Sequence, residues 1–331
     1  MIKMPKIFLQ AFAMFILTAI FYYVFLLSAV SDSSAMVNVF IDDGSGMKDI
    51  ASLLKDKNLI RSELAFKIHS FSTGSAHILK PGNYNLTPDL RTPAIVRRLV
   101  NGPDPIKVLI TEGMSLKDIE NKLIALGLLQ QGELINYEIQ DIKDEYTFLE
   151  SRKSLEGFLF PDTYQFFPDS NPRAIVKKFL DNFEKKALPF FEVDSEKFDY
   201  DFLIIASLIE REISISEDRR LVSGILWKRF KIGMPLQIDA TVAYVKCGNK
   251  FEDCEPLTRS DFKVNSLYNT YYYRGLPPTP IANPGLDSIV AAFKPKKSEF
   301  LYYLSDPITK KTFFSRTLEE HNEKRARYLH L

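Results

Sequence analysis

The chain has 331 residues, and its 43 Lys and Arg residues nearly balance 42 Asp and Glu residues, which gives a formal net charge of +1. This length is enough for two domains, or for one large domain with a sizeable core. The near-neutral charge offers no general electrostatic reason to bind nucleic acid or another acidic polymer, so we expect no nucleic-acid partner.

The N-terminal segment is expected to hold the chain in a membrane. Lys3 and Lys6 precede residues 7–30, which contain no charged residue. As a helix, this stretch would rise about 36 Å, which exceeds the roughly 30 Å hydrocarbon core of a bilayer. The basic residues place the N-terminus, residues 1–6, in the cytoplasm and the chain after the anchor outside. A cleaved signal peptide is the alternative, although its apolar core is usually shorter.

An internal repeat follows the anchor. The sequence VFIDDGSGMKDIASLLKDKNLI (Val39–Ile60) aligns without gaps onto VLITEGMSLKDIENKLIALGLL (Val108–Leu129). Each copy is typical of a short alternating strand, a glycine turn and an amphipathic helix. Between the copies, residues 79–86 predict a turn and a strand, and residues 92–105 predict a helix that starts at a proline and ends at a Gly-Pro pair.

Strand–turn–helix units of this kind resemble the LysM class of glycan-binding modules. We therefore interpret residues 37–150 as a LysM-like α+β subdomain, and a small α+β spacer remains the alternative. Further along, residues 171–184 have a helical pattern, and residues 300–322 predict two core strands and a closing helix. The predicted fold class is α+β: a single transmembrane helix, the LysM-like subdomain, and a mixed α+β domain over 151–331.

The two cysteines of the chain, Cys247 and Cys254, flank a short polar loop. In an oxidising compartment outside the membrane a disulfide between them is reasonable, and two free thiols are the alternative. There is no CxxC motif, and the four histidines are scattered along the sequence. We therefore expect no metal site, and no motif calls for a cofactor.

The strongest candidate for chemistry is the pair of glutamates in IIASLIEREISISEDRR, residues 204–220. Glu212 continues the apolar stripe of the predicted helix, whereas Glu210 is rotated away from it. The stretch Ser214–Glu217 matches a capping box, so a new helix should begin near Ser214 and leave Glu212 at the end of the first one. Apolar neighbours and the negative end of the helix dipole would both raise the pKa of Glu212, as a general acid requires. A structural ion pair between Glu212 and Arg211, Arg219 or Arg220 is the alternative.

Two further segments could line a binding cleft. Residues 236–242 alternate and predict a strand with one apolar face and one polar face that carries Gln237, Asp239 and Thr241. Such a face suits a hydroxyl-rich ligand, but an ordinary half-exposed strand would show the same alternation. In residues 266–285, Asn269 can bond both donor and acceptor groups of a sugar, and the tyrosines of 268–273 offer flat faces for sugar rings. A rigid surface loop is the alternative for this segment.

Several motifs together resemble one family. EGFLFPDTY, ASLIERE, DRRLVSGILWKRFKIGMPLQIDATVAY, YNTY…GLPPTPIANPG and FLYYLSD…TFFSRTLEEHN occur in this order, and as a set they are similar to the YceG-like (MltG) family of endolytic murein transglycosylases. The resemblance covers nearly all of the chain after the anchor. Two positions depart from the familiar pattern: Arg211 stands where Lys is also seen, and Asn283 stands where a small or hydroxyl residue is familiar.

The resemblance implies a single-pass protein of the bacterial inner membrane whose catalytic domain is periplasmic. It implies a lyase that cleaves the MurNAc–GlcNAc β-1,4 bond of nascent glycan strands without water, leaves 1,6-anhydro-MurNAc ends and ends strand elongation. Peptidoglycan synthases of the elongation machinery are the further partners that it allows. Onto this chain it maps Glu212 as general acid and base and Glu210 in a supporting role. The substrate-binding residues that we expect are Gln237, Asp239, Thr241, Tyr268, Asn269 and Tyr271.

Two other functions fit the same residues. A non-catalytic, membrane-anchored scaffold that binds peptidoglycan would share the anchor and the repeat. A hydrolase that uses Asp239 as base or nucleophile would share the cleft. A single acid/base residue can serve both transglycosylase steps if the acetamido group of the substrate stabilises the cation, so the absence of an obvious second nucleophile does not argue against the lyase.

Overall fold

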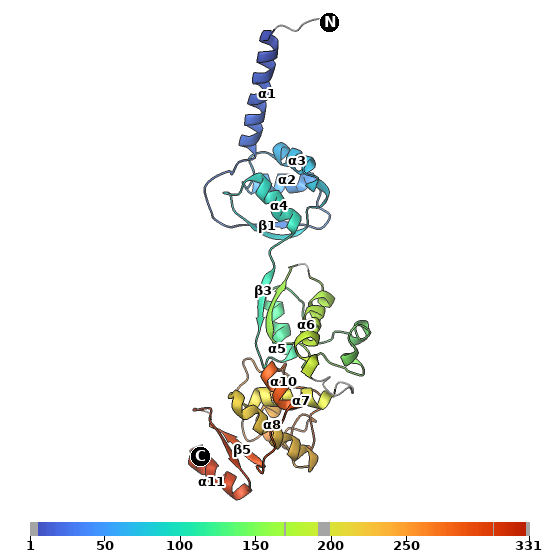
Figure 1. The fold of residues 1–331 in the computed structure, drawn as a ribbon, viewed down its shortest axis with the longest axis vertical. Coiled ribbons are helices and arrows are strands. Elements are labelled where there is room, and N and C mark those ends of the chain that lie inside the picture. The colour runs from blue at the N-terminus through green and yellow to red at the C-terminus, as the bar shows by residue number, and fades with distance from the viewer. Residues whose placement is uncertain (1–5, 169, 191–198, 307, 329–331) are drawn as a thin grey trace. The chain divides into compact units, whose positions relative to one another are not determined.

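The structure is a computed structural model that describes residues 6–168, 170–190, 199–306 and 308–328. The chain forms two compact units, residues 1–106 with 167–169, and residues 107–166 with 170–331. In the described residues, α-helices combine with three two-stranded sheets, so the mixed α+β class is confirmed (Figure 1). The predicted cytoplasmic segment 1–6 lies outside the described residues except for Lys6.

The first unit contains five helices and strands besides its N-terminal helix. In chain order its elements are α1 (Lys6–Leu26), β1 (Val37–Ile41), α2 (Met47–Asp56), α3 (Glu63–Ser72), a 3₁₀ turn (Ser75–His77), β2 (Gly82–Leu86) and α4 (Thr92–Asn101). Strands β1 and β2 pair antiparallel, with Val37 opposite Leu86 and Ile41 opposite Gly82. Helix α4 has a proline in its first turn and ends before Gly102, as the sequence predicted.

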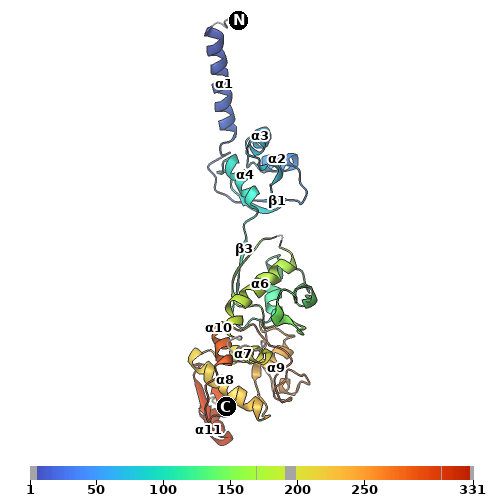
Figure 2. The same cartoon turned by 45° about the vertical axis from the view of Figure 1, so that its right-hand side comes forward.

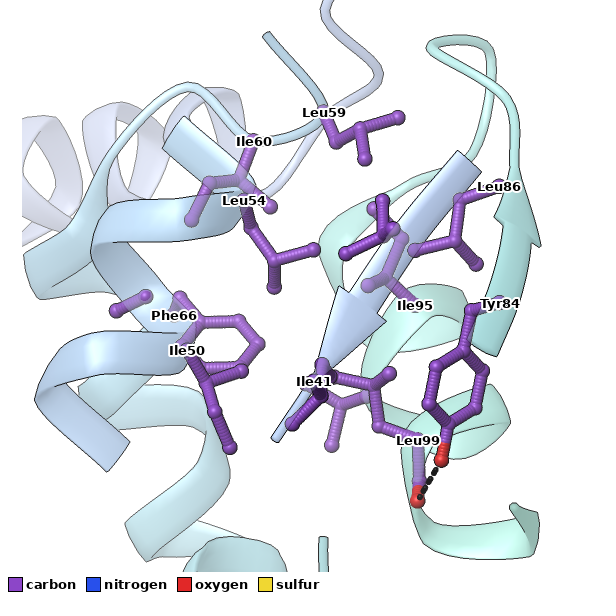
Figure 3. Packing of buried hydrophobic residues seen from close by; sticks show 13 residues of the cluster. Ile41, Ile50, Leu54, Leu59, Ile60, Phe66, Tyr84, Leu86, Ile95 and Leu99 are labelled. Carbon is purple, nitrogen blue, oxygen red and sulfur yellow. Dashed lines mark hydrogen bonds between the residues drawn. The ribbon is translucent and has the colours of Figure 1, made fainter. Parts of the chain in front are cut away.

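The core of this unit lies between the sheet and its helices. Alternate residues of β1 and β2 are buried, so one face of each strand meets the apolar stripes of α2 and α4. Figure 3 shows Leu54 and Phe66 pointing toward this sheet, and Tyr84 OH donating a hydrogen bond to Leu99 O at 3.4 Å. The buried tyrosine therefore keeps a partner for its hydroxyl.

The N-terminal helix differs from the expected anchor. Helix α1 ends at Leu26, four residues before Val30. Beyond the helix end, the Arg61 guanidinium donates hydrogen bonds to Ser28 Oγ, Ala29 O and Val30 O. These bonds hold the three residues in a non-helical conformation. Among the described residues, no helix has both the length and the apolar character that a membrane span requires. The expectation of a spanning helix over 7–30 is thus not confirmed.

The second unit holds the remaining elements. They are β3 (Ile106–Ile110), which starts at the unit boundary, α5 (Leu116–Ala125), β4 (Asp162–Phe166), α6 (Pro172–Lys186), α7 (Tyr200–Glu212), α8 (Ser216–Lys231), α9 (Asp239–Lys246), α10 (Leu286–Phe293), β5 (Tyr302–Ser305), β6 (Thr312–Ser315) and α11 (Leu318–Tyr328), with 3₁₀ turns at Ile139–Asp141, Thr147–Leu149, Leu188–Phe190 and Asp261–Lys263. Helix α7 packs against α8, α9 and α10, and α11 packs on the β5–β6 hairpin (Figure 2). This confirms the two strands and closing helix predicted over 300–322.

Both copies of the repeat adopt the predicted strand–turn–helix conformation. They correspond to β1 with α2 and to β3 with α5. Gly44 and Gly113, which are equivalent in the alignment, both have φ of +79°, a left-handed conformation that favours glycine. Ser115 also caps α5 by accepting a hydrogen bond from Asp118 N, while Asp118 accepts one from Ser115 N.

The compact units do not follow the boundary at 150/151. The first copy of the repeat belongs to the first unit, and the second copy belongs to the second unit, which begins at Lys107. The reason is the pairing of β3 with β4, a strand that comes from beyond residue 150. This pairing joins the second copy to the chain that follows it.

The polar strand predicted over 236–242 is wrong. Gln237 has a left-handed φ of +55°, and α9 begins two residues later at Asp239. Thr241 Oγ1 donates to Ile238 O at 2.7 Å within the first helical turn, and an acidic residue at the start of a helix is favoured by the helix dipole. Turn chemistry and helix capping therefore outweigh the two-residue alternation of this short segment.

Helix α7 ends at Glu212, as predicted. The capping box expected over 214–217 does not form, because α8 starts at Ser216 with Ile215 as its N-cap. Ser216 Oγ instead donates to Asp287 Oδ2 at 2.8 Å.

Candidate active site

Glu212 occupies the last position of α7, a helix whose residues 203–209 are all buried. The side chain is itself half-buried. Burial raises the pKa of the Glu212 carboxyl to about 7, and the negative charge of Asp239 adds to the shift. A hydrogen bond from Ala240 N–H and one from Tyr303 OH, at 3.4 Å from Glu212 Oε2, act in the opposite direction. A large share of Glu212 is therefore protonated at neutral pH.

Glu212 opens onto a cavity of about 760 Å³, within the size range of ligand sites. Its walls come from the end of α7, from α8, from the turn before α9, from the loop near 262–271, from β5 and from α11. The lining residues are Glu212, Arg229, Gln237, Asp239, Phe262, Tyr271, Tyr302, Tyr303, Leu304, Ser305, Leu318, His321 and Arg325. Carboxyl, amide, hydroxyl and aromatic groups thus face one partly open cleft.

Asp239 and Tyr271 form one wall of this cavity. Tyr271 OH donates a hydrogen bond to Asp239 Oδ1. Burial and the Asp239 charge raise the pKa of the Tyr271 hydroxyl, so it stays a donor. Gln237 stands beside them in its left-handed conformation, which costs energy for a residue other than glycine. Local strain of this kind is common at binding sites.

Glu210 has a structural partner. Its carboxylate lies 3.1 Å from Arg219 Nη2 and accepts a hydrogen bond from Gly285 N at 2.9 Å. Both side chains of the ion pair are buried. The pair ties α7 to α8 and to the start of α10, so Glu210 supports the site through the fold and does not line the cavity.

A second buried carboxyl, Glu156, holds together the segments beneath the site. It accepts hydrogen bonds from Leu116 N at the start of α5, from Tyr244 OH of α9 and from Asn283 Nδ2. Burial raises the pKa of Glu156 to about 8. Asn283 also accepts from Gly157 N and Leu159 N, so these two side chains link four segments that are distant in sequence.

Cys247 and Cys254 form a disulfide with a Cα–Cα distance of 5.6 Å. The bond closes the loop that follows α9, and this resolves the choice between paired and free thiols. Across the ranges that the structure describes, no group of three or more His, Cys, Asp or Glu side chains is placed to hold a metal ion.

Comparison with known proteins agrees with the motifs. The model of the YceG-like family matches residues 39–327. The chain belongs to the YceG-like family. It is 32% identical over 316 residues to the endolytic murein transglycosylase of Bacillus subtilis, covering 90% of this chain and 86% of that protein.

Two further relatives show the same family. The endolytic murein transglycosylase of Streptococcus pneumoniae D39 is 28% identical over 334 residues, which covers 92% of this chain and 60% of that longer protein. The crystal structure of a protein described as YceG-like from Listeria monocytogenes is 31% identical, has a TM-score of 0.60, and covers 88% of this chain and 100% of that one. The resemblance drawn from the motifs is confirmed.

The YceG-like chain brings four of the predicted site residues to the cavity: Glu212, Gln237, Asp239 and Tyr271. Three others point elsewhere. Thr241 and Asn269 are fully buried, and Asn269 donates to Phe262 O and Val264 O while its Oδ1 accepts from Tyr271 N. Tyr268 OH pairs with Thr279 Oγ1 at 2.8 Å. These residues shape the loops that carry Phe262 and Tyr271, so their predicted direct contact with substrate is not supported.

The sequence did not point to four other groups that line this YceG-like site. Arg229, Tyr303, His321 and Arg325 come from α8, β5 and α11. Tyr303 and His321 lie in residues 300–322, which were expected only to form two core strands and a closing helix. Tyr303 lies 91 positions from Glu212, and neither alternation nor helical spacing signals such a long-range contact.

Proposed function

We propose that this chain is an endolytic murein transglycosylase, a lyase that cuts glycan strands of peptidoglycan internally. The names of its curated relatives support this proposal. The observation that carries it is the position of Glu212, a carboxyl with a pKa raised to about 7 on the wall of a large polar cavity. Such a group can donate a proton at neutral pH and then accept one.

We propose a two-step use of this single group on the MurNAc–GlcNAc β-1,4 bond. The protonated Glu212 donates its proton to the glycosidic oxygen as the bond from that oxygen to C1 of the muramyl residue breaks. The resulting carboxylate takes the proton of the muramyl C6 hydroxyl, and O6 forms the new bond to C1. The products are a free GlcNAc 4-hydroxyl and a 1,6-anhydro-MurNAc end, and no water is consumed. Cleavage of a nascent strand in this way would end its elongation.

The neighbours of Glu212 suit this cycle. Asp239 raises the pKa of Glu212 and so favours the acid form before the first step, whereas Tyr303 OH can stabilise the carboxylate formed by it. Gln237 and Tyr271 supply an amide and a hydroxyl for the sugar hydroxyls and acetamido groups. We propose that Asp239 stabilises positive charge that develops at C1.

Product mass gives the direct test. Purified protein is incubated with uncrosslinked glycan strands, and the fragments are analysed by mass spectrometry. Anhydro-ended fragments whose masses sum to that of the substrate support the proposal, and their absence from the Glu212→Gln reaction would assign the proton transfer to Glu212. Wild-type protein that binds strands but yields no fragments would instead indicate a scaffold.

A hydrolase is a second candidate, because Asp239 lies close enough to Glu212 to raise its pKa and two carboxyl groups in one cavity are typical of glycosidases. Hydrolysis adds one water, about 18 mass units, to the summed products. If the same spectra show this added mass, the protein is a hydrolase and not a lyase.

We also propose where the protein works and what it meets there. The charge-free stretch 7–30 supports attachment to the bacterial inner membrane with the catalytic unit outside, where nascent strands and synthases of the elongation machinery are found. Release of the protein from washed membranes by sodium carbonate would contradict this attachment. The repeat of residues 39–60 in residues 108–129 supports glycan binding, and co-sedimentation with murein no stronger than with cellulose would contradict that role.

A further inference from the structure

The cavity that Glu212 lines also carries basic groups that the proposed mechanism does not use. The Arg229 side chain is only 4% exposed. Its Nε donates to Leu301 O at 2.7 Å, and its Nη1 donates to Leu236 O at 2.7 Å. These partners are neutral carbonyls. No carboxylate pairs with Arg229, and its Nη2 has no hydrogen-bond partner, among the residues that the structure describes.

A second basic side chain that lines the cavity, His321, has one ring nitrogen without a hydrogen-bond partner among the described residues. His321 stacks on Tyr302, with ring centroids 5.4 Å apart, and its Nδ1 is buried without a hydrogen bond in the described part of the chain. Burial, followed by the charges of Arg325, Arg229 and Lys324, lowers the pKa of this imidazole. These effects place three cations around His321.

Not all of these charges are balanced within the protein. Lys324 pairs with Glu320 at 2.6 Å. Arg325, one helical turn from His321, lines the cavity as an exposed side chain and has no ion pair in the ranges described. Arg229 is the buried cation of this group. A buried cation without an anion is costly, and the cost falls when an anionic ligand arrives. In the part of the chain that the structure describes, neither carboxyl of the cavity forms an ion pair with these cations.

We propose that Arg229, His321 and Arg325 form a carboxylate-binding subsite, and that its ligand is a free carboxylate of the peptide attached to the muramyl residue. A guanidinium binds a carboxylate through two parallel hydrogen bonds, which gives both affinity and orientation. In intact strands the lactyl carboxyl is consumed in the amide bond to the peptide, so the free carboxylates belong to the peptide. The enzyme would therefore select strands that still carry their peptides. This inference rests on the proposed function.

The test compares substrates as well as proteins. Glycan strands with intact peptides are prepared in native form and with their carboxyl groups amidated, and KM and kcat are measured on both for the full chain. Arg325→Gln is the test variant, because Arg229 also holds main-chain carbonyls and its substitution could unfold the protein. Arg327→Gln is the matched control, since Arg327 is an exposed arginine of the same helix outside the cavity.

We expect amidation to raise KM for wild type and Arg327→Gln about tenfold, the equivalent of one charge-assisted contact. Arg325→Gln should show the raised KM already on native strands, and its KM should differ little between native and amidated strands. Equal KM values for native and amidated strands in wild type, or unchanged discrimination in Arg325→Gln, would overturn the subsite. Anhydro product would still form in that case, whereas failure of the proposed function would remove the product from every reaction.

A third substrate separates two sources of carboxylate. Amidase-treated strands lose the peptide and expose the lactyl carboxylate on the sugar itself. A tenfold higher KM for these strands in wild type assigns the subsite to the peptide. If wild type has the same KM for amidase-treated and native strands, and Arg325→Gln still raises it, the peptide is not the ligand. The subsite would then bind the lactyl carboxylate.

Discussion

The Glu210 carboxylate lies 3.1 Å from Arg219 Nη2, whereas Glu212, two residues further along α7, has no such ion pair in the described chain. The two glutamates thus lie in the same helical turn, but only Glu210 is ion-paired. Glu210→Gln should break a buried ion pair and lower the free energy of unfolding by about 3 kcal/mol. Glu212→Gln should lower kcat by roughly 10²-fold or more without lowering stability at pH 8. Urea unfolding and product release by each variant separate the two roles, and equal stability losses would contradict them.

The rate should depend on the protonation of Glu212. Because the pKa of this carboxyl is raised to about 7, kcat/KM should fall as the pH rises through about 7. Tyr303→Phe removes a hydrogen bond that lowers this pKa, so the fall should move to higher pH. Asp239→Asn removes a charge that raises it, so the fall should move to lower pH. A pH profile of each variant measures the midpoint, and shifts in the same direction would be inconsistent with the site as described.

Glu156 should make stability depend on pH. Its pKa is raised to about 8 by burial, above the ordinary value near 4.5. Below pH 4.5 the group is protonated in both states. Between about 4.5 and 8 it ionises only in the unfolded chain, so folding takes up a proton and stability falls by up to about 1.4 kcal/mol per pH unit. Glu212 adds to the same trend up to about pH 7.

The variant Glu156→Gln should lack the Glu156 part of this decline. Its free energy of unfolding, followed by urea titration from pH 5 to pH 9, should fall less steeply than that of the wild type between pH 5 and about pH 8. Parallel curves across this range would show that Glu156 does not titrate as its buried position requires.

The disulfide should contribute modestly to stability. Cys247 and Cys254 are separated by seven positions, so the bond closes a short loop. Chain entropy predicts a loss of about 2 kcal/mol in the double serine variant. Because the loop directly follows α9, which carries Asp239, we also expect a lower kcat in the reduced wild type. Thermal unfolding with and without reductant checks the first effect, with the double variant as the reductant-insensitive control.

Much of the fold was predictable because local signals agreed with one another. The repeat combined alternation, a left-handed glycine and an amphipathic helix in each copy, and both copies fold accordingly. The strand prediction for residues 236–242 was wrong because so short a pattern also fits the start of a helix. The left-handed turn at Gln237 selects the helix. Alternation alone carries no information about such a turn.

Of the site residues, too, some could be predicted from local signals and others could not. Glu212 could be found from its place on an apolar stripe at a helix end, because both features are local. Tyr303 and His321 could not, because their contribution depends on how the hairpin and α11 meet the end of α7. The prediction that Asn269 binds sugar is not supported for a similar reason. Its amide could bind a sugar, but it already donates hydrogen bonds to two main-chain carbonyls.

The duplicated glycine turn has diverged in its surroundings. A Cβ on Gly44 would meet no atom within 4 Å, whereas one on Gly113 would lie 3.2 Å from Arg211 Nη1, and that nitrogen donates to Gly113 O. Arg211 immediately precedes Glu212. The backbone conformation favours glycine in both copies, but only the second turn also contacts α7. A larger residue at Gly113 would therefore displace the Arg211 side chain, next to Glu212 at the end of α7.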